Sequence, residues 1–170
     1  MIHLRRYRYV GPAELRDQAI AVDTVVADTP MALARWLGGL ERNELVEPLT
    51  FVVALDGVLR LAPRRSEHVA LAAGHDILAA GEMTLVSAGA GWRVAEVTNQ
   101  STGYCPDPDS WPAVGRALDG LGLKHPGDFT DKVVFRRCPA CGERNIVRES
   151  DFTCALCDGA LPAEWNFTSP

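Results

Sequence analysis

The chain has 170 residues, of which 47% are hydrophobic and 23% are charged. This balance is typical of a globular protein and excludes an extended disordered chain or a collagen-like one. Seventeen basic residues stand against twenty-two acidic ones, so the net charge of −5 excludes a generic phosphate binder, although not a local basic patch. A chain of this length can bury one core without disulfide bonds.

The first ten residues, MIHLRRYRYV, are charged and lack the apolar run of a signal peptide. The longest apolar stretch, residues 69–81, is interrupted by His75 and Asp76 and is too short to cross a bilayer. We therefore expect a cytoplasmic protein with no membrane partner. Five cysteines in a reducing compartment favour metal binding or redox chemistry over disulfide bonds.

The N-terminal part predicts two strands and a helix. Residues 3–10 alternate between polar and apolar side chains, and residues 19–26 are rich in β-branched side chains, so both segments favour strands. Thr29 and Pro30 are typical of a helix N-cap and first turn. The apolar residues that follow continue this helix to a pair of glycines that weakens it.

Two hairpins are expected next. Residues 50–55 and 58–62 are apolar runs separated by an Asp-Gly pair, which predicts a hairpin with a type I′ turn. Residues 82–87 and 92–98 are also strand-like, and a short run of alanine and glycine joins them.

A second helix and a short strand complete the first domain. Ser110 or Asp109 is placed to cap a helix with Pro112 in its first turn, and residues 132–135 favour a strand. Sequential hairpins with about two helices indicate an α+β fold with a mainly antiparallel sheet over residues 1–131.

Four of the five cysteines form two C-x2-C pairs, with twelve residues between the pairs. Each pair folds as a tight knuckle that directs two thiolates at one ion, and four thiolates provide the tetrahedral set that Zn²⁺ prefers. The pattern therefore predicts one structural zinc ion per chain, held by Cys138, Cys141, Cys154 and Cys157. A redox dithiol and a four-sulfur iron site are the alternatives.

This spacing resembles the zinc-ribbon family over residues 133–162, with all four ligand positions matched. The resemblance implies a small metal-stabilised unit, which we assign to residues 132–170. Gly142 and Gly159 are expected to supply the permissive backbone of the two knuckles. The segment 145–153 is long enough for one hairpin between the cysteine pairs.

The charge of the ribbon argues against a nucleic-acid reader. Residues 132–167 carry five basic and five acidic side chains, and such a balance is no electrostatic footprint for phosphate. Trp165 and Phe167 are expected to dock the C-terminal tail onto the main domain. We therefore interpret the ribbon as a metal-stabilised cover.

The middle of the chain carries a second resemblance. Four stretches define it, in this order: residues 50–62, 66–74, 79–82 and 101–106. Over about residues 50–112 the chain resembles a domain of plant IQ-motif calmodulin-binding proteins and of some bacterial effector or toxin-like proteins. Where that pattern has Gly-His, this chain has Thr102-Gly103, so the histidine is absent and no activity is carried over.

Polar side chains beside the predicted strands are candidates for a ligand site. The stretch 99–102 offers amide and hydroxyl groups that could orient a polar ligand, with turn formation as the equal alternative. The expected ligand-binding residues are Arg60, Arg64, Arg65, Glu82, Asn99, Ser101 and Tyr104.

A basic cluster at the start of the chain is a further candidate. Arg5, Arg6 and Arg8 alternate with two tyrosines, and a cationic surface with aromatic rings suits single-stranded nucleic acid or a nucleotide if residues 60–65 lie alongside it. An exposed strand edge protected by charge is the favoured alternative.

The leading functional hypothesis is a cytoplasmic, zinc-stabilised binding protein with a protein partner or a small polar ligand. An enzyme that acts on a nucleotide-like or protein substrate at the same site is one alternative, and a nucleic-acid-binding module is a less favoured one. Cys105 could form a nucleophile–base pair with His68 or His75, but a lone cysteine is more often a small buried hydrophobe.

Overall fold

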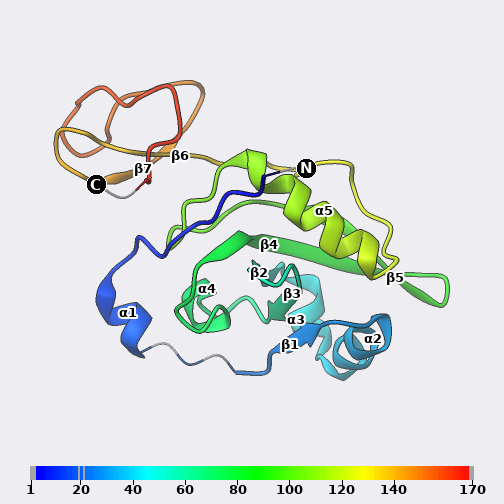
Figure 1. Cartoon of the computed structure of the whole chain (residues 1–170). Coiled ribbons are helices and arrows are strands. Elements are labelled where there is room, and N and C mark those ends of the chain that lie inside the picture. Colours follow the sequence, from blue (N-terminus) through cyan, green and yellow to red (C-terminus); the bar gives the residue numbers. More distant parts are fainter. Residues whose placement is uncertain (1–2, 19, 21, 169–170) are drawn as a thin grey trace.

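The computed structural model of the chain describes residues 3–18, 20 and 22–168. Figure 1 shows an α+β domain with a small two-stranded ribbon beside it, which confirms the expected fold class. The strands are β1 (Val25–Ala27), β2 (Leu49–Ala54), β3 (Leu59–Ala62), β4 (Ile77–Ala88), β5 (Gly91–Val97), β6 (Val134–Arg137) and β7 (Arg144–Val147). The helices are α1 (Ala13–Gln18), α2 (Pro30–Gly39), α3 (Arg42–Val46), α4 (His68–Leu71) and α5 (Trp111–Gly120), with a 3₁₀ turn at Pro108–Ser110. No helix in the described part of the chain has the length and apolar character needed to cross a membrane.

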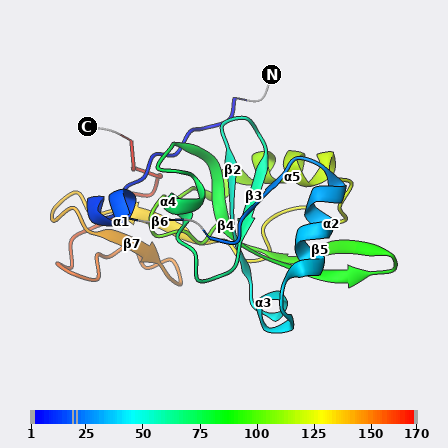
Figure 2. The same cartoon turned by 90° about the horizontal axis from the view of Figure 1, so that it is seen from below.

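The main sheet has the strand order β1-β3-β2-β4-β5, and every neighbouring pair is antiparallel. Both predicted hairpins, β2–β3 and β4–β5, are therefore confirmed. β4 begins several residues earlier than predicted, and the tip of the β4–β5 hairpin extends beyond the rest of the sheet (Figure 2). These two long strands carry one end of the sheet toward the loops that face the ribbon.

Helices cover both faces of the sheet because its central strands are apolar on both sides. Phe51 and Val53 of β2 belong to the larger core cluster, together with Leu37 of α2 and Leu118 of α5. Val52 points to the opposite face, into a second cluster under α4. The second cluster also holds the rings of two buried tyrosines, Tyr7 and Tyr104, which come from loops.

The turn of the first hairpin differs from the prediction. The Ala54 N–H donates to the Val58 carbonyl at 3.1 Å, and the Gly57 N–H donates to the Ala54 carbonyl at 2.9 Å. Gly57 has a φ of 81°, whereas Asp56 has no positive φ. The loop is thus a three-residue turn with a left-handed glycine, and the type I′ assignment is wrong. The Asp56 carboxylate accepts from the Val58 N–H at 2.9 Å, which favours this local conformation.

The N-terminal segment is also not the strand that its alternation predicts. Only Tyr7 forms a ladder-like bridge, and its N–H and C=O bond to Ile77 at 2.8 and 2.9 Å. The arginines around Tyr7 are exposed, so the segment buries a single side chain and continues as an irregular arm. The second predicted strand is shorter, because β1 begins at Val25. Residues 19 and 21 of that prediction lie outside the described residues.

The two predicted helices begin where their capping residues stand. The Thr29 hydroxyl accepts from the Ala32 N–H at 3.1 Å at the start of α2, as expected. Ser110 occupies the N-cap of α5, but its hydroxyl donates to the Asp107 carbonyl at 2.7 Å and makes no cap bond. The Asp107 carboxylate instead accepts from the Asp109 N–H, which stabilises the preceding 3₁₀ turn.

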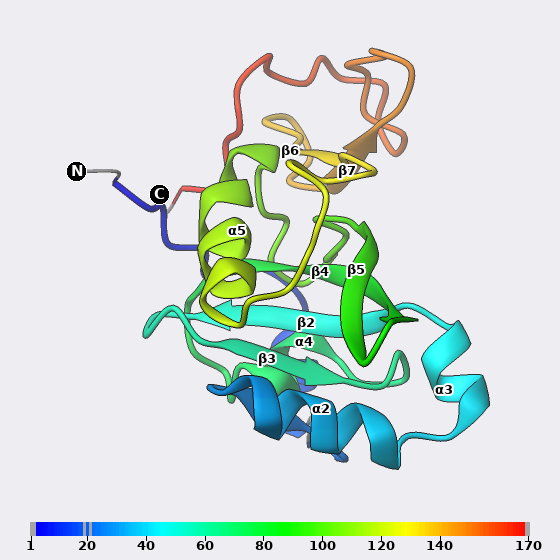
Figure 3. The same ribbon diagram turned by 90° about the vertical axis from the view of Figure 1, so that its right-hand side faces the viewer.

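The ribbon hairpin lies earlier in the chain than predicted. β7 pairs with β6, which precedes the first cysteine pair, so the hairpin encloses that pair. Beyond β7, the segment 145–153 contributes two isolated bridges: one from Thr153 to Ala160, and one within it, between Arg148 and Asp151. Glu149 and Ser150 both have positive φ values there, because the chain must reverse within two residues. Figure 3 shows the ribbon at the opposite end of the molecule from α2.

The C-terminal tail returns to the α+β domain, as predicted. The Trp165 indole N–H donates to the Cys105 carbonyl at 2.7 Å, and its ring meets the Tyr7 ring edge-on at 5.4 Å. Phe167 is buried in a cluster with Cys105 and Phe135. The tail therefore connects the N-terminal arm, the loop at Cys105 and the ribbon.

Candidate functional site

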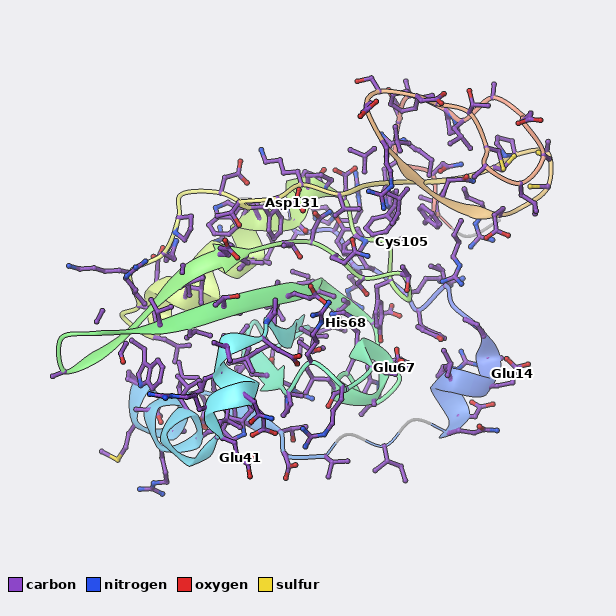
Figure 4. The ribbon with its side chains drawn as sticks, turned by 180° about the vertical axis from the view of Figure 1, so that it is seen from behind. Glu14, Glu41, Glu67, His68, Cys105 and Asp131 are labelled. Carbon is purple, nitrogen blue, oxygen red and sulfur yellow. The ribbon has the colours of Figure 1, made fainter. Side chains whose placement is uncertain are left out.

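The four ribbon cysteines form one cluster. Their sulfur atoms all lie within 4.8 Å of one another, with 3.6 Å between Cys138 and Cys157 and also between Cys141 and Cys154. A Zn–S bond of about 2.3 Å implies an S–S distance of about 3.8 Å at a tetrahedral ion, so this spacing fits a metal ion such as zinc. Figure 4 shows the sulfur atoms gathered at the far end of the ribbon.

The two knuckles have matching backbone bonds. The Gly142 N–H donates to the Cys138 carbonyl at 2.8 Å, and the Asp158 N–H donates to the Cys154 carbonyl at 3.0 Å. Gly142 and Asp158 both have positive φ values, 80° and 61°. The expectation is therefore confirmed for Gly142, but in the second knuckle the left-handed residue is Asp158.

Gly159 is required for a different reason. A Cβ atom at this position would lie 3.2 Å from the Cys157 sulfur and 3.4 Å from the Cys138 sulfur. The glycine thus lets the backbone approach the cluster closely, where any side chain would crowd the thiolates.

Asn145 supports the cluster from the hairpin. It is 5% exposed, its amide donates to the Cys154 sulfur at 3.4 Å, and its carbonyl accepts from the Ala155 N–H at 2.9 Å. Burial opposes ionisation of Cys154, yet N–H donors from Cys157, Asn145 and Leu156 outweigh it and lower the pKa of this thiol to about 6. A residue that orients a thiolate in this way is characteristic of metal sites.

The three arginines of the expected ligand site lie in different places, and only Arg64 is close to Glu82. Arg60 lies 3.7 Å from Asp56, and its Nε is buried without a hydrogen-bond partner. Arg64 lies 3.9 Å from Glu82. Arg65 turns away from both.

Arg65 is held at the far edge of the sheet. Its guanidinium contacts Asp23 at 2.6 Å and Glu44 at 2.8 Å. Its hydrogen bond to Glu44 lowers the pKa of that carboxyl. Arg65 therefore belongs to an ion-pair network between α3 and the segment before β1, away from Arg60 and Arg64.

The polar residues of the expected site are buried and bonded to the backbone. The Asn99 amide donates to the carbonyls of Pro106 and Val133 at 2.9 and 2.8 Å, and its carbonyl accepts from the Val133 N–H at 2.7 Å. The Ser101 hydroxyl accepts from the Tyr104 N–H at 3.3 Å. Side chains that hold a loop in this way stabilise structure, and a ligand role for them stays a prediction.

Tyr104 is likewise engaged inside the fold. Its hydroxyl donates to the His75 carbonyl at 2.7 Å, and burial raises its pKa. Because Tyr104 is fully buried, it positions the turn at His75 and Asp76 from beneath. That turn borders an arginine-lined surface around Asp76.

Three adjoining hollows surround the exposed side chain of Asp76. The first, about 460 Å³, is lined by Arg60 and Asp56, and the second, about 290 Å³, by Arg8 and Arg16. The third, about 250 Å³, lies under the C-terminal tail, and besides Asp76 its charged and aromatic lining is Arg5, Arg6, Arg8, Trp165 and Phe167. We call this surface the Asp76 hollows. It is bounded by five arginines and two aspartates.

The sequence raises residues 60–65 as neighbours of the N-terminal arginines, but it does not predict that Asp76 and Arg16 join them. Arg8 and Arg60 are 52 positions apart, and Asp76 follows a turn in which Ala73 and Gly74 have positive φ values. The double positive φ requires a sharp reversal, which the small residues at this point could have indicated. Arg16 lies on α1, a helix absent from the sequence prediction.

A further hollow of about 560 Å³ lies between the ribbon and the loop 102–105. Cys105 borders it, and Figure 4 shows this residue between the ribbon and the sheet. Its thiol donates to the Thr102 carbonyl at 3.4 Å, and burial raises its pKa to about 12. Because of this raised pKa, the Cys105 thiol is protonated at neutral pH. His68 bonds to the Gly81 carbonyl at 2.8 Å, and no histidine base lies beside the thiol among the described contacts.

No protein-family model, curated protein or solved structure matches this chain. The resemblance of the middle segment to the plant and bacterial proteins therefore receives no support from a family match. The cysteine cluster stands on its own geometry.

Proposed function

We propose that this protein is a cytoplasmic, zinc-stabilised binding protein that takes a small anionic ligand in the Asp76 hollows of its α+β domain. The metal is one structural Zn²⁺ held by Cys138, Cys141, Cys154 and Cys157. Four thiolates leave no open coordination position, so the ion stabilises the ribbon and performs no chemistry on a substrate. Four reduced cysteines also suit a reducing compartment.

The observation that carries the ligand proposal is the concentration of five arginines around Asp76 and Asp56 in an otherwise acidic protein. Arg6 and Arg8 are exposed and form no ion pair within 4.0 Å among the described residues. The buried Nε of Arg60 has no acceptor. A ligand with phosphate or carboxylate oxygens would provide acceptors and charge for these groups.

Ligand binding is tested by thermal unfolding of the zinc-loaded protein with three probes: inorganic phosphate, ATP and a single-stranded oligonucleotide. Binding to the folded state raises the melting temperature by mass action. We expect at least one probe to stabilise the wild type and to lose this effect in Arg6→Ala/Arg8→Ala. The matched control is Arg42→Ala/Arg116→Ala, which removes the same charge from exposed positions elsewhere.

The pattern of responses separates the candidate ligands. Stabilisation by ATP or phosphate supports a small anionic ligand. A response to the oligonucleotide alone supports the nucleic-acid alternative, for which Trp165 beside the arginines would offer a stacking surface. No response to any probe, or an equal loss in the control variant, refutes the proposed site.

The metal is tested separately by elemental analysis of the purified protein. We expect one zinc per chain in the wild type and much less in Cys154→Ser. A zinc content well below one per chain in the freshly purified wild type would contradict the metal assignment.

A further inference from the structure

The backbone N–H and C=O groups of Arg137, at the outer edge of β6, have hydrogen-bond partners, whereas those at the outer edge of β7 have none among the described residues. The Cys138 N–H donates to the Glu143 carbonyl at 2.8 Å, so these two residues form a hydrogen-bonded pair. In an antiparallel ladder such pairs alternate with pairs whose N–H and C=O groups point away from the partner strand. The next pair is Arg137 and Arg144, whose backbone groups must therefore point to the outer edges of β6 and β7.

The outer edge of β6 confirms this pattern because it is already occupied. The Asn166 side chain accepts from the Arg137 N–H at 2.8 Å and donates to the Arg137 carbonyl at 2.7 Å. Asn166 thus pairs with β6 as a neighbouring strand would. It belongs to the tail, which protects this edge.

The outer edge of β7 has no such cover. The same alternation turns the N–H and C=O groups of Arg144 and Ile146 outward, and no described residue hydrogen-bonds to them. An uncovered edge is a template for another strand. The hollow of about 560 Å³ lies along this edge, because four consecutive residues, 143–146, line it.

The walls of this hollow specify the chemistry of an occupant. Phe135, Ile146 and Leu156 are its large apolar residues, and Leu156 is 68% exposed. The Arg144 guanidinium donates to the Thr102 carbonyl and has no carboxylate within 4.0 Å among the described residues. The hollow thus offers backbone pairing, an apolar floor and the Arg144 guanidinium, with Glu143 as the other charged residue of its lining.

We propose that an extended segment of a partner protein adds to β7 as a third strand of the ribbon. The segment places apolar side chains over Ile146 and Leu156 and a carboxylate beside Arg144. Main-chain hydrogen bonds provide affinity in such strand addition, and alternate side chains provide specificity. This surface is separate from the Asp76 hollows, so it stands whether or not an anionic ligand binds there.

The test is a selection of displayed random peptides on the zinc-loaded full-length protein, with counter-selection on Arg144→Glu/Leu156→Asp. Leu156 is exposed on the second knuckle, and zinc content verifies that the variant keeps its fold. We expect enriched peptides with alternating apolar residues and an acidic residue. Synthetic copies should bind the variant at least tenfold more weakly than the wild type, whereas Arg148→Glu, an exposed control just beyond β7, should bind them normally.

Backbone N-methylation of the selected peptide provides the decisive readout. Methylation at every second amide should abolish binding, and methylation at the intervening amides should leave it intact, because only alternate N–H groups face β7. Equal effects at both sets of amides would overturn strand addition. The absence of any enriched peptide, or a wild-type dimer that Arg144→Glu/Leu156→Asp dissociates, would also overturn it, the latter by assigning the edge to a second copy of the chain.

Discussion

Replacing Asn99 by alanine tests whether this buried amide holds the protein together or awaits a ligand. Asn99 is 0% exposed and makes three hydrogen bonds of 2.7–2.9 Å to backbone groups of Pro106 and Val133. The substitution leaves those three groups buried without a partner. Each unsatisfied buried group costs about 1–3 kcal/mol. We therefore expect Asn99→Ala to lower the free energy of unfolding by about 3 kcal/mol or more.

The assay is urea unfolding of the zinc-loaded protein, followed by circular dichroism. The matched control is Asn43→Ala, an exposed asparagine on α3, which should change stability by no more than about 0.5 kcal/mol. If Asn99→Ala lost less than about 1 kcal/mol, the hydrogen bonds would not have the role assigned to them. Unchanged stability together with weakened ligand binding would restore Asn99 to the ligand site.

Three further outcomes are expected. A Cβ atom on Gly81 would lie 1.9 Å from a backbone oxygen in the segment after β5. Gly81→Ala should therefore lower the free energy of unfolding in urea by about 3 kcal/mol or more, whereas Gly91→Ala, with open space around it, should lower it far less. Equal losses in the two variants would contradict this packing. Burial opposes the charge on His125, but Asp119 at 2.7 Å outweighs burial and raises the pKa of the imidazole. The pair therefore stabilises the fold below pH 6.5, and this contribution is lost as the pH rises through the raised pKa. NMR titration should show a lower His125 pKa in Asp119→Asn, and an unchanged pKa would refute the pairing. Chelation of the metal should undock Trp165 and red-shift its fluorescence, with Trp165→Phe as the control; an unaltered spectrum after verified metal loss would show that the tail docks without the ion.

The parts of the fold that the sequence predicted are those that depend on neighbours along the chain. The two hairpins, the capped start of α2 and the paired cysteines all have their signals within a few residues. The N-terminal arm was misassigned because its one ladder partner, Ile77, is 70 positions away and Tyr7 alone is buried. The type I′ turn failed because the Asp56 side chain favours a different local turn.

The candidate ligand residues were harder to predict for a related reason. Polar side chains near strand ends are as useful for satisfying backbone groups as for binding a ligand, and Asn99 and Ser101 do the former. The Asp76 hollows depend on four segments that approach one another only in the folded chain. A list of arginines could not show that Arg60 belongs with Arg8 while Arg65 belongs with Glu44.

The docking of the tail has a consequence for the order in which the molecule is built. The Tyr7 ring and the Cys105 carbonyl emerge from the ribosome long before Trp165, which contacts both of them. Domains generally fold as units during synthesis, with N-terminal domains first. The sheet can therefore form early, but the arm and the loop at Cys105 lack their contacts with Trp165 until the residues after Cys157 have been synthesised. Docking of Trp165 thus joins segments that are synthesised far apart in time, because its partners Tyr7 and Cys105 precede it by 158 and 60 positions.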